Sequence, residues 1–149
     1  GKPDTEHPKR PIEGFHCNRS EVSGTRLWGL FSEKFGSADR FFTHHYVANY
    51  CPLVFMEVSG RNRTPDRLPS IESEPLYFAC DAQLRRLVEI LQPKWLIAIG
   101  TFSEKRATIA LTGLQIKISR ILHPSPANPR ANAGWDKEVT KKLEELEIW

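Results

Sequence analysis

A histidine and an asparagine are each predicted to lie where a strand ends. His123 follows a strand-like run over residues 115–122, and Asn49 ends a run rich in aromatic and β-branched residues. An imidazole can donate a hydrogen bond while neutral, and a carboxamide both donates and accepts. Two such side chains are suited to binding a polar ligand or to catalysis on it. Their types alone do not identify the ligand.

The loop that follows His123 is expected to be stiff and to project outward. Pro124, Pro126 and Pro129 fix φ and remove backbone donors, so the loop keeps its shape without the regular backbone hydrogen bonds of a helix or sheet. A rigid loop beside a titratable ring is suited to insertion into a partner. The alternative is a proline-rich connector with a solvent-facing histidine. For Asn49 the alternative is an amide that caps local backbone.

The elements that must position these residues alternate between helix and strand. Apolar spacing predicts helices over residues 20–36, 80–91, 103–111 and 136–146. Strands are predicted over residues 95–99 and 115–122, and within 41–55, where the strand ends near Asn49. The polar stretches 1–18 and 59–75 are predicted to be an irregular lead-in and a surface loop.

This order of elements predicts an α/β fold with a mostly parallel sheet, in a single domain over residues 1–149. Right-handed crossovers bring the carboxyl ends of parallel strands to one edge, where open α/β sheets bind their ligands. Asn49 and His123 are therefore expected to share one crevice.

Composition restricts the class of protein. The 149 residues are enough for one domain, and the net charge of +3 permits a polyanionic partner without demanding one. Cys17, Cys51 and Cys80 are widely separated, which argues against a disulfide framework or a four-cysteine metal site. We therefore expect reduced cysteines in an intracellular protein, with no metal and no membrane association.

Five segments carry a resemblance to a known family. They are residues 7–11, 20–24 with Trp28, 49–53, 59–65 and 123–135. In this order they resemble the single-strand-selective monofunctional uracil-DNA glycosylases of the uracil-DNA glycosylase superfamily. The last segment resembles the motif that this family inserts into DNA.

The resemblance implies a three-layer α/β/α fold and a DNA repair activity. Such an enzyme hydrolyses the N-glycosidic bond of uracil in single- and double-stranded DNA, leaving an abasic site in base excision repair. The resemblance also implies action on 5-hydroxymethyluracil, no cofactor and a monomer. The protein would be nuclear in a eukaryote and cytoplasmic in a bacterium.

The resemblance also assigns roles to individual residues. His123 is expected to donate a hydrogen bond to uracil O2 and to stabilise the departing anion. Asn49 is expected to read the base, accepting from N3–H and donating to O4, a pattern that cytosine reverses. The residues expected to contact DNA are Pro124, Ser125, Pro126, Ala127, Asn128, Pro129 and Arg130. Further candidates for phosphate contact are Lys9, Arg10, Arg61, Arg63 and Arg67.

Two departures from the family pattern matter for function. Ala127 stands where the family often has the arginine that fills the hole left by a flipped base, which favours single-stranded or mispaired uracil. The family's Gly-Met-Asn-Pro-Gly loop, whose asparagine positions the attacking water, has no match in residues 1–19. We therefore expect the chain to be the carboxyl-terminal part of such an enzyme.

Two alternatives remain open. One is a non-catalytic nucleic-acid-binding α/β domain, which the absent water-positioning loop makes credible. The other is a glycosylase of the same superfamily that prefers hypoxanthine or xanthine.

Overall fold

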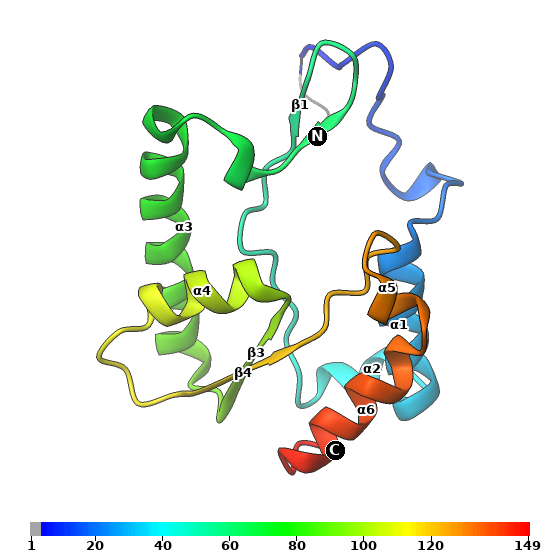
Figure 1. Cartoon of the computed structure of the whole chain (residues 1–149), viewed down its shortest axis with the longest axis vertical. Helices are drawn as coiled ribbons and strands as arrows, with labels where there is room; N and C mark the ends of the chain where they lie inside the picture. Colours follow the sequence, from blue (N-terminus) through cyan, green and yellow to red (C-terminus); the bar gives the residue numbers. More distant parts are fainter. Residues whose placement is uncertain (1–3) are drawn as a thin grey trace. The chain divides into compact units, whose positions relative to one another are not determined.

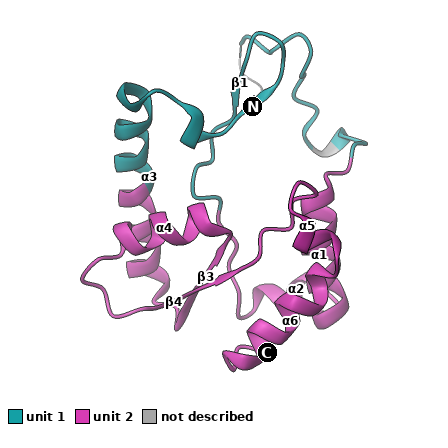
Figure 2. Cartoon of the chain, in the orientation of Figure 1, with its two compact units in different colours: residues 1–19, 49–80 teal, residues 20–48, 81–149 magenta. Residues whose placement is uncertain are grey.

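The computed structural model describes residues 4–149, with the side chain of Phe15 excepted (Figure 1). Two compact units make up the chain, as Figure 2 shows: unit 1 is Gly1–Arg19 with Asn49–Cys80, and unit 2 is Ser20–Ala48 with Asp81–Trp149. The single domain over residues 1–149 stays a prediction. Residues 4–18 are mostly irregular, as predicted, whereas residues 1–3 of that lead-in lie outside the described residues.

Unit 2 contains the predicted pair of parallel strands. Strand β3 (Trp95–Ile99) pairs with β4 (Lys117–Ile121), so that Trp95 lies opposite Lys117 and Ile99 opposite Ile121. Helix α4 (Thr101–Ala110) connects the two strands. Its small residues Ala107 and Ala110 are buried in a cluster with Val88, which lets the helix approach the sheet closely. The predicted βαβ unit is confirmed.

A second core cluster in unit 2 joins helices at the two ends of its sequence. Helix α1 (Val22–Phe35) contributes Leu30, and α6 (Trp135–Glu145) contributes Trp135, Val139 and Leu143. Short helix α5 (Pro129–Asn132) lies between the His123 loop and α6. Helix α1 ends at Gly36, as predicted, because glycine readily adopts the left-handed conformation observed there, with φ 73°.

The strand predicted within residues 41–55 and ending near Asn49 is wrong. Helix α2 (Ala38–Phe42) is capped by Ser37, whose Oγ accepts from the Arg40 N–H, and residues 43–54 have no regular structure. The Phe41 ring instead stacks on Phe31, with centroids 4.5 Å apart. A strand forms only where a neighbour pairs with it, and none does so for residues 43–54 in the described part of the chain.

Unit 1 holds a short hairpin and the start of a long helix. Strand β1 (Phe55–Met56) pairs antiparallel with β2 (Asn62–Arg63). The 3₁₀ helices η1 (Gly14–His16) and η2 (Pro65–Arg67) lie in the remaining loops.

Helix α3 (Ser70–Leu91) starts in unit 1 and ends in unit 2. Its first residues correct the loop predicted over 59–75. The Pro69 oxygen accepts from the N–H groups of Glu72 and Ser73 at the start of the helix, and Pro75 lies within it.

The chain is thus a mixed helix and strand protein with two two-stranded sheets among residues 4–149. This agrees with the predicted α/β class, whereas the three-layer arrangement around a larger central sheet stays a prediction. No helix of the described residues is long and apolar enough to span a membrane.

Candidate active site

His123 lies just beyond the carboxyl end of β4, as predicted, against the turn from β3 to α4. Gly100 forms this turn. Its N–H donates to the Ile121 oxygen at 3.0 Å, which adds one hydrogen bond to those between β3 and β4. A Cβ placed on Gly100 would lie 3.1 Å from the His123 Cβ and 3.3 Å from its ring Cδ2. The bare glycine backbone therefore makes room for the imidazole at this edge of the sheet.

We predict that Gly100→Ala destabilises unit 2 and displaces His123. Gly100 has φ 91° and ψ 167°, a region that is essentially restricted to glycine and costs other residues about 1–3 kcal/mol. Urea unfolding and the NMR shifts of the His123 ring measure the two effects.

The matched control is Gly29→Ala in α1, where an added Cβ has nothing within 4 Å. Because alanine favours a helix over glycine, this control should raise stability by about 0.5–1 kcal/mol. If Gly100→Ala raised the free energy of unfolding as much as Gly29→Ala does, the proposed fit of His123 against Gly100 would be contradicted.

The His123 ring is held in one tautomer by its own loop. The backbone N–H of Ser125 donates to Nδ1 at 3.1 Å, so Nδ1 is an acceptor and the neutral ring carries its proton on Nε2. His123 is an exposed residue. The arrangement therefore presents an Nε2–H donor to an incoming ligand without requiring a positive charge on the ring.

The loop after His123 is built from local hydrogen bonds. The Asn128 N–H donates to the Ser125 oxygen at 3.0 Å, closing a β-turn with Pro126 and exposed Ala127 at its centre. The Ala127 N–H donates to Ser125 Oγ, and Asn128 Oδ1 accepts from the Arg130 N–H to begin α5. These bonds support the prediction of a stiff loop, with Ala127 at its tip.

Three residues elsewhere in unit 2 anchor the loop to its helices. Trp135, only 2% exposed, donates from Nε1 to the Leu122 oxygen at 2.7 Å. Arg26 of α1 donates to the Pro124 oxygen, and Asn132 of α5 donates to the Pro126 oxygen at 2.9 Å. Sequence spacing gave no signal for Arg26, which is 98 residues from Pro124.

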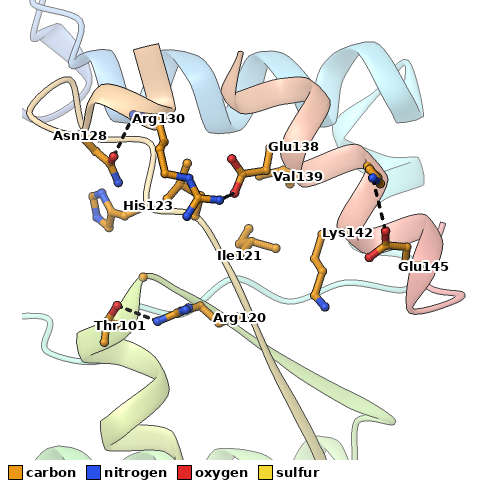
Figure 3. A pocket seen from close by; sticks show the side chains of 13 residues that line it. Thr101, Arg120, Ile121, His123, Asn128, Arg130, Glu138, Val139, Lys142 and Glu145 are labelled. Atoms are coloured by element: carbon orange, nitrogen blue, oxygen red, sulfur yellow. Dashed lines mark hydrogen bonds and ion pairs between the residues drawn. The ribbon is translucent and has the colours of Figure 1, made fainter. Parts of the chain in front are cut away.

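A cavity of about 500 Å³ opens beside His123 (Figure 3). Its charged lining residues are Arg120, Arg130, Lys141, Lys142, Glu138 and Glu145. Arg130 pairs with Glu138 at 2.7 Å, and Arg120 donates to Thr101 Oγ1 at 2.8 Å. Arg120 also pairs with Glu104 at 3.2 Å, and Lys141 with Glu145 at 3.9 Å. With Glu104 included, four cationic groups face three carboxylates, and the excess of one positive charge is compatible with a phosphate-bearing ligand.

Asn49 belongs to unit 1, whereas His123 belongs to unit 2. It is an exposed residue in the irregular segment before β1, so its predicted place at a strand end is wrong. The next residue, Tyr50, donates from its hydroxyl to the Tyr77 oxygen of α3 at 3.4 Å. The predicted convergence of Asn49 with His123 stays a prediction, as does the base-reading role.

Three of the loop arginines considered for phosphate contact have partners in unit 1, and one of them, Arg61, pairs with Glu57 at 3.5 Å. Arg10 Nε donates to the Gly60 oxygen at 3.0 Å, and Arg63 donates to the Arg67 oxygen. These guanidinium groups hold the loops around the hairpin. Among residues 4–149, no group of three or more His, Cys, Asp or Glu side chains could hold a metal ion.

Known glycosylases are similar to this chain in sequence. The chain is 45% identical to the single-strand selective monofunctional uracil-DNA glycosylase of Rattus norvegicus over 146 residues, which are 97% of the chain and 52% of that protein. The corresponding proteins of Mus musculus and Bos taurus are each 44% identical over 97% of the chain and over 52% and 54% of their own lengths. The predicted resemblance is confirmed. No protein-family model matches the sequence, and the chain spans about half the length of the curated relatives it matches.

Proposed function

We propose that this chain acts in a monofunctional uracil-DNA glycosylase, a hydrolase that cleaves the N-glycosidic bond of uracil in DNA during base excision repair. The similarity to three glycosylases over 97% of the chain supports the activity. The proposed fold of the active enzyme is the three-layer α/β/α arrangement, in which β3 and β4 belong to the central parallel sheet.

The observation that carries the proposal is the hydrogen bond from the Ser125 N–H to His123 Nδ1, which leaves Nε2 to carry the proton of the neutral ring. As the glycosidic bond breaks, negative charge develops on the uracil and positive charge on the sugar. An Nε2–H donor aimed at uracil O2 stabilises that anion, and removing a donor of this kind typically costs about 3 kcal/mol of transition-state stabilisation. A neutral ring is sufficient, because the donor is already in place before charge develops.

DNA binding is proposed to use the loop and the cavity beside it. The turn at Pro126 and Ala127 would enter the duplex, and the cationic groups around the cavity would contact phosphates. Asn49 would read the extruded base through its amide. The substrates proposed are uracil in single- and double-stranded DNA and, secondarily, 5-hydroxymethyluracil.

One assay tests this function directly. Oligonucleotides with a single uracil are incubated with the chain, both alone and extended at its amino end by a segment carrying the Gly-Met-Asn-Pro-Gly loop, and abasic sites are then cleaved with alkali. We expect excision in the extended form, because the attacking water needs to be positioned. Tight binding without excision in both forms would favour a non-catalytic DNA-binding domain, an alternative that the positive excess around the cavity also fits.

We predict that Ala127→Arg raises excision from base-paired duplex. Ala127 is exposed at the loop tip, and a methyl group is too small to fill the hole left by a flipped base. The ratio of rates on U·A duplex and single-stranded uracil should rise several-fold in this variant. The control is Ala133→Arg, because Ala133 is also exposed but lies outside the turn. No gain on the paired duplex in Ala127→Arg would argue against insertion of the loop tip.

A further inference from the structure

The Arg26 guanidinium contacts the one peptide unit that orients the His123 ring. Its Nη1 donates to the Pro124 oxygen at 3.0 Å. The same peptide unit carries the Ser125 N–H, which donates to His123 Nδ1 at 3.1 Å. A peptide unit is planar, so fixing the direction of its oxygen also fixes the direction of its N–H. Arg26 is thereby connected to the imidazole through a single rigid group.

The two hydrogen bonds on this peptide strengthen each other. A positively charged donor on the oxygen polarises the peptide and makes its N–H a better donor. An Nδ1 that accepts from a strong donor keeps its lone pair engaged, and the ring proton then stays on Nε2. The charge of Arg26 thus acts in the direction that presents Nε2–H to a ligand.

Arg26 also holds the far side of the loop. Its Nη2 donates to Asn132 Oδ1 at 2.8 Å, and Asn132 Nδ2 donates to the Pro126 oxygen at 2.9 Å. Two prolyl oxygens that flank Ser125 are therefore tied, directly or through Asn132, to one guanidinium. A planar group with several donors in fixed directions suits this task, whereas an ammonium is a point charge.

The backbone of Arg26 is held by the core of unit 2. It lies on α1 one turn before Leu30, which is 8% exposed and packs in the cluster that contains Trp135 and Val139. Trp135 in turn holds the Leu122 oxygen just before His123. Both sides of the His123 backbone are thus fixed to the same core.

We propose that Arg26 is a positioning residue that sets the tautomer and orientation of His123 through the Pro124–Ser125 peptide. This inference rests on the proposed function for its effect on excision. Its effect on the ring can be measured whether or not the chain excises uracil.

The test compares Arg26→Met with the unaltered chain by ¹⁵N NMR of the His123 ring while the ring is neutral. The proton should lie on Nε2 in the unaltered chain and be distributed over both nitrogens in Arg26→Met. In the form that excises uracil, kcat should fall about tenfold, with little change in KM. Loss of the hydrogen-bond partner of a metal-ligating histidine costs about 10–100-fold, and the lower end of that range is expected for a contact made through a peptide.

Arg85→Met is the matched control. Arg85 also donates to two backbone oxygens of unit 2, those of Ala110 and Thr112, but it contacts no part of the His123 loop. It should leave the His123 ring and kcat unchanged. Should Arg26→Met fail to fold, Arg26→Lys is the second variant. Lysine keeps the positive charge but lacks the planar set of donors, so part of the ring proton should move from Nε2 to Nδ1, though less than in Arg26→Met.

An unchanged Nε2 proton in a folded Arg26 variant would overturn the proposal, whatever happens to activity. Absence of excision in the extended form that keeps Arg26, with the ring responding as expected, would instead count against the proposed function alone.

Discussion

Replacement of His123 by alanine is expected to lower the rate of uracil excision about 10²–10³-fold, the usual effect of removing one donor to a developing anion. The Nε2–H is the group lost, because Nδ1 is occupied by the Ser125 N–H. Single-turnover kinetics on a uracil-containing oligonucleotide measure the chemical step. The loss should be in kcat more than in DNA affinity, since the donor matters most in the transition state.

His44→Ala is a suitable control for this experiment. His44 is another exposed histidine of unit 2 and lies outside the loop and the cavity. It should leave excision unchanged. If His123→Ala retained full activity, the anion would have to be stabilised by another group, and the role assigned to this ring would be rejected.

Asn49→Ala is expected to reduce uracil excision by about 5- to 150-fold while DNA binding changes little. This range corresponds to the roughly 1–3 kcal/mol typical of a bidentate base contact. The amide contacts only the extruded base in the proposed complex, whereas the phosphates are contacted by cationic groups elsewhere. Excision is measured on single-stranded uracil, and binding by fluorescence anisotropy with an oligonucleotide that carries an abasic analogue.

Asn18→Ala provides the matched asparagine in unit 1, because Asn18 is also exposed and lies outside regular structure. It should behave like the unaltered chain in both measurements. Equal losses of excision and binding in Asn49→Ala would point to a structural or DNA-binding role and would contradict base reading.

The stiffness of the His123 loop has a consequence for binding. A loop that is already ordered by its own turn, by α5 and by Arg26 loses little conformational freedom when it contacts DNA. Its prolines alone restrict φ, but the bonds from Arg26, Asn132 and Trp135 decide where the loop points. Loosening these anchors should weaken catalysis before it weakens electrostatic attraction to DNA.

The parts of the fold that sequence alone predicted correctly have local causes. Strand β3 is a continuous apolar run ended by Gly100, and α6 carries buried Val139 and Leu143 at helical spacing. The position of His123 at the end of β4 follows from the same pattern. Each of these features depends on residues that are close together in the chain.

The parts of the fold that sequence alone did not predict depend on contacts between residues that are far apart in the chain. The aromatic residues around Phe41 have strand propensity, yet they pack against α1 because no neighbouring strand pairs with them in the described residues. Residues 70–75 joined α3 despite Pro75. Arg26 reaches the Pro124 oxygen across 98 positions of sequence. Residue type and periodicity thus placed the imidazole at the sheet edge, while its tautomer and direction came from hydrogen bonds between distant segments, which only the folded chain brings within reach.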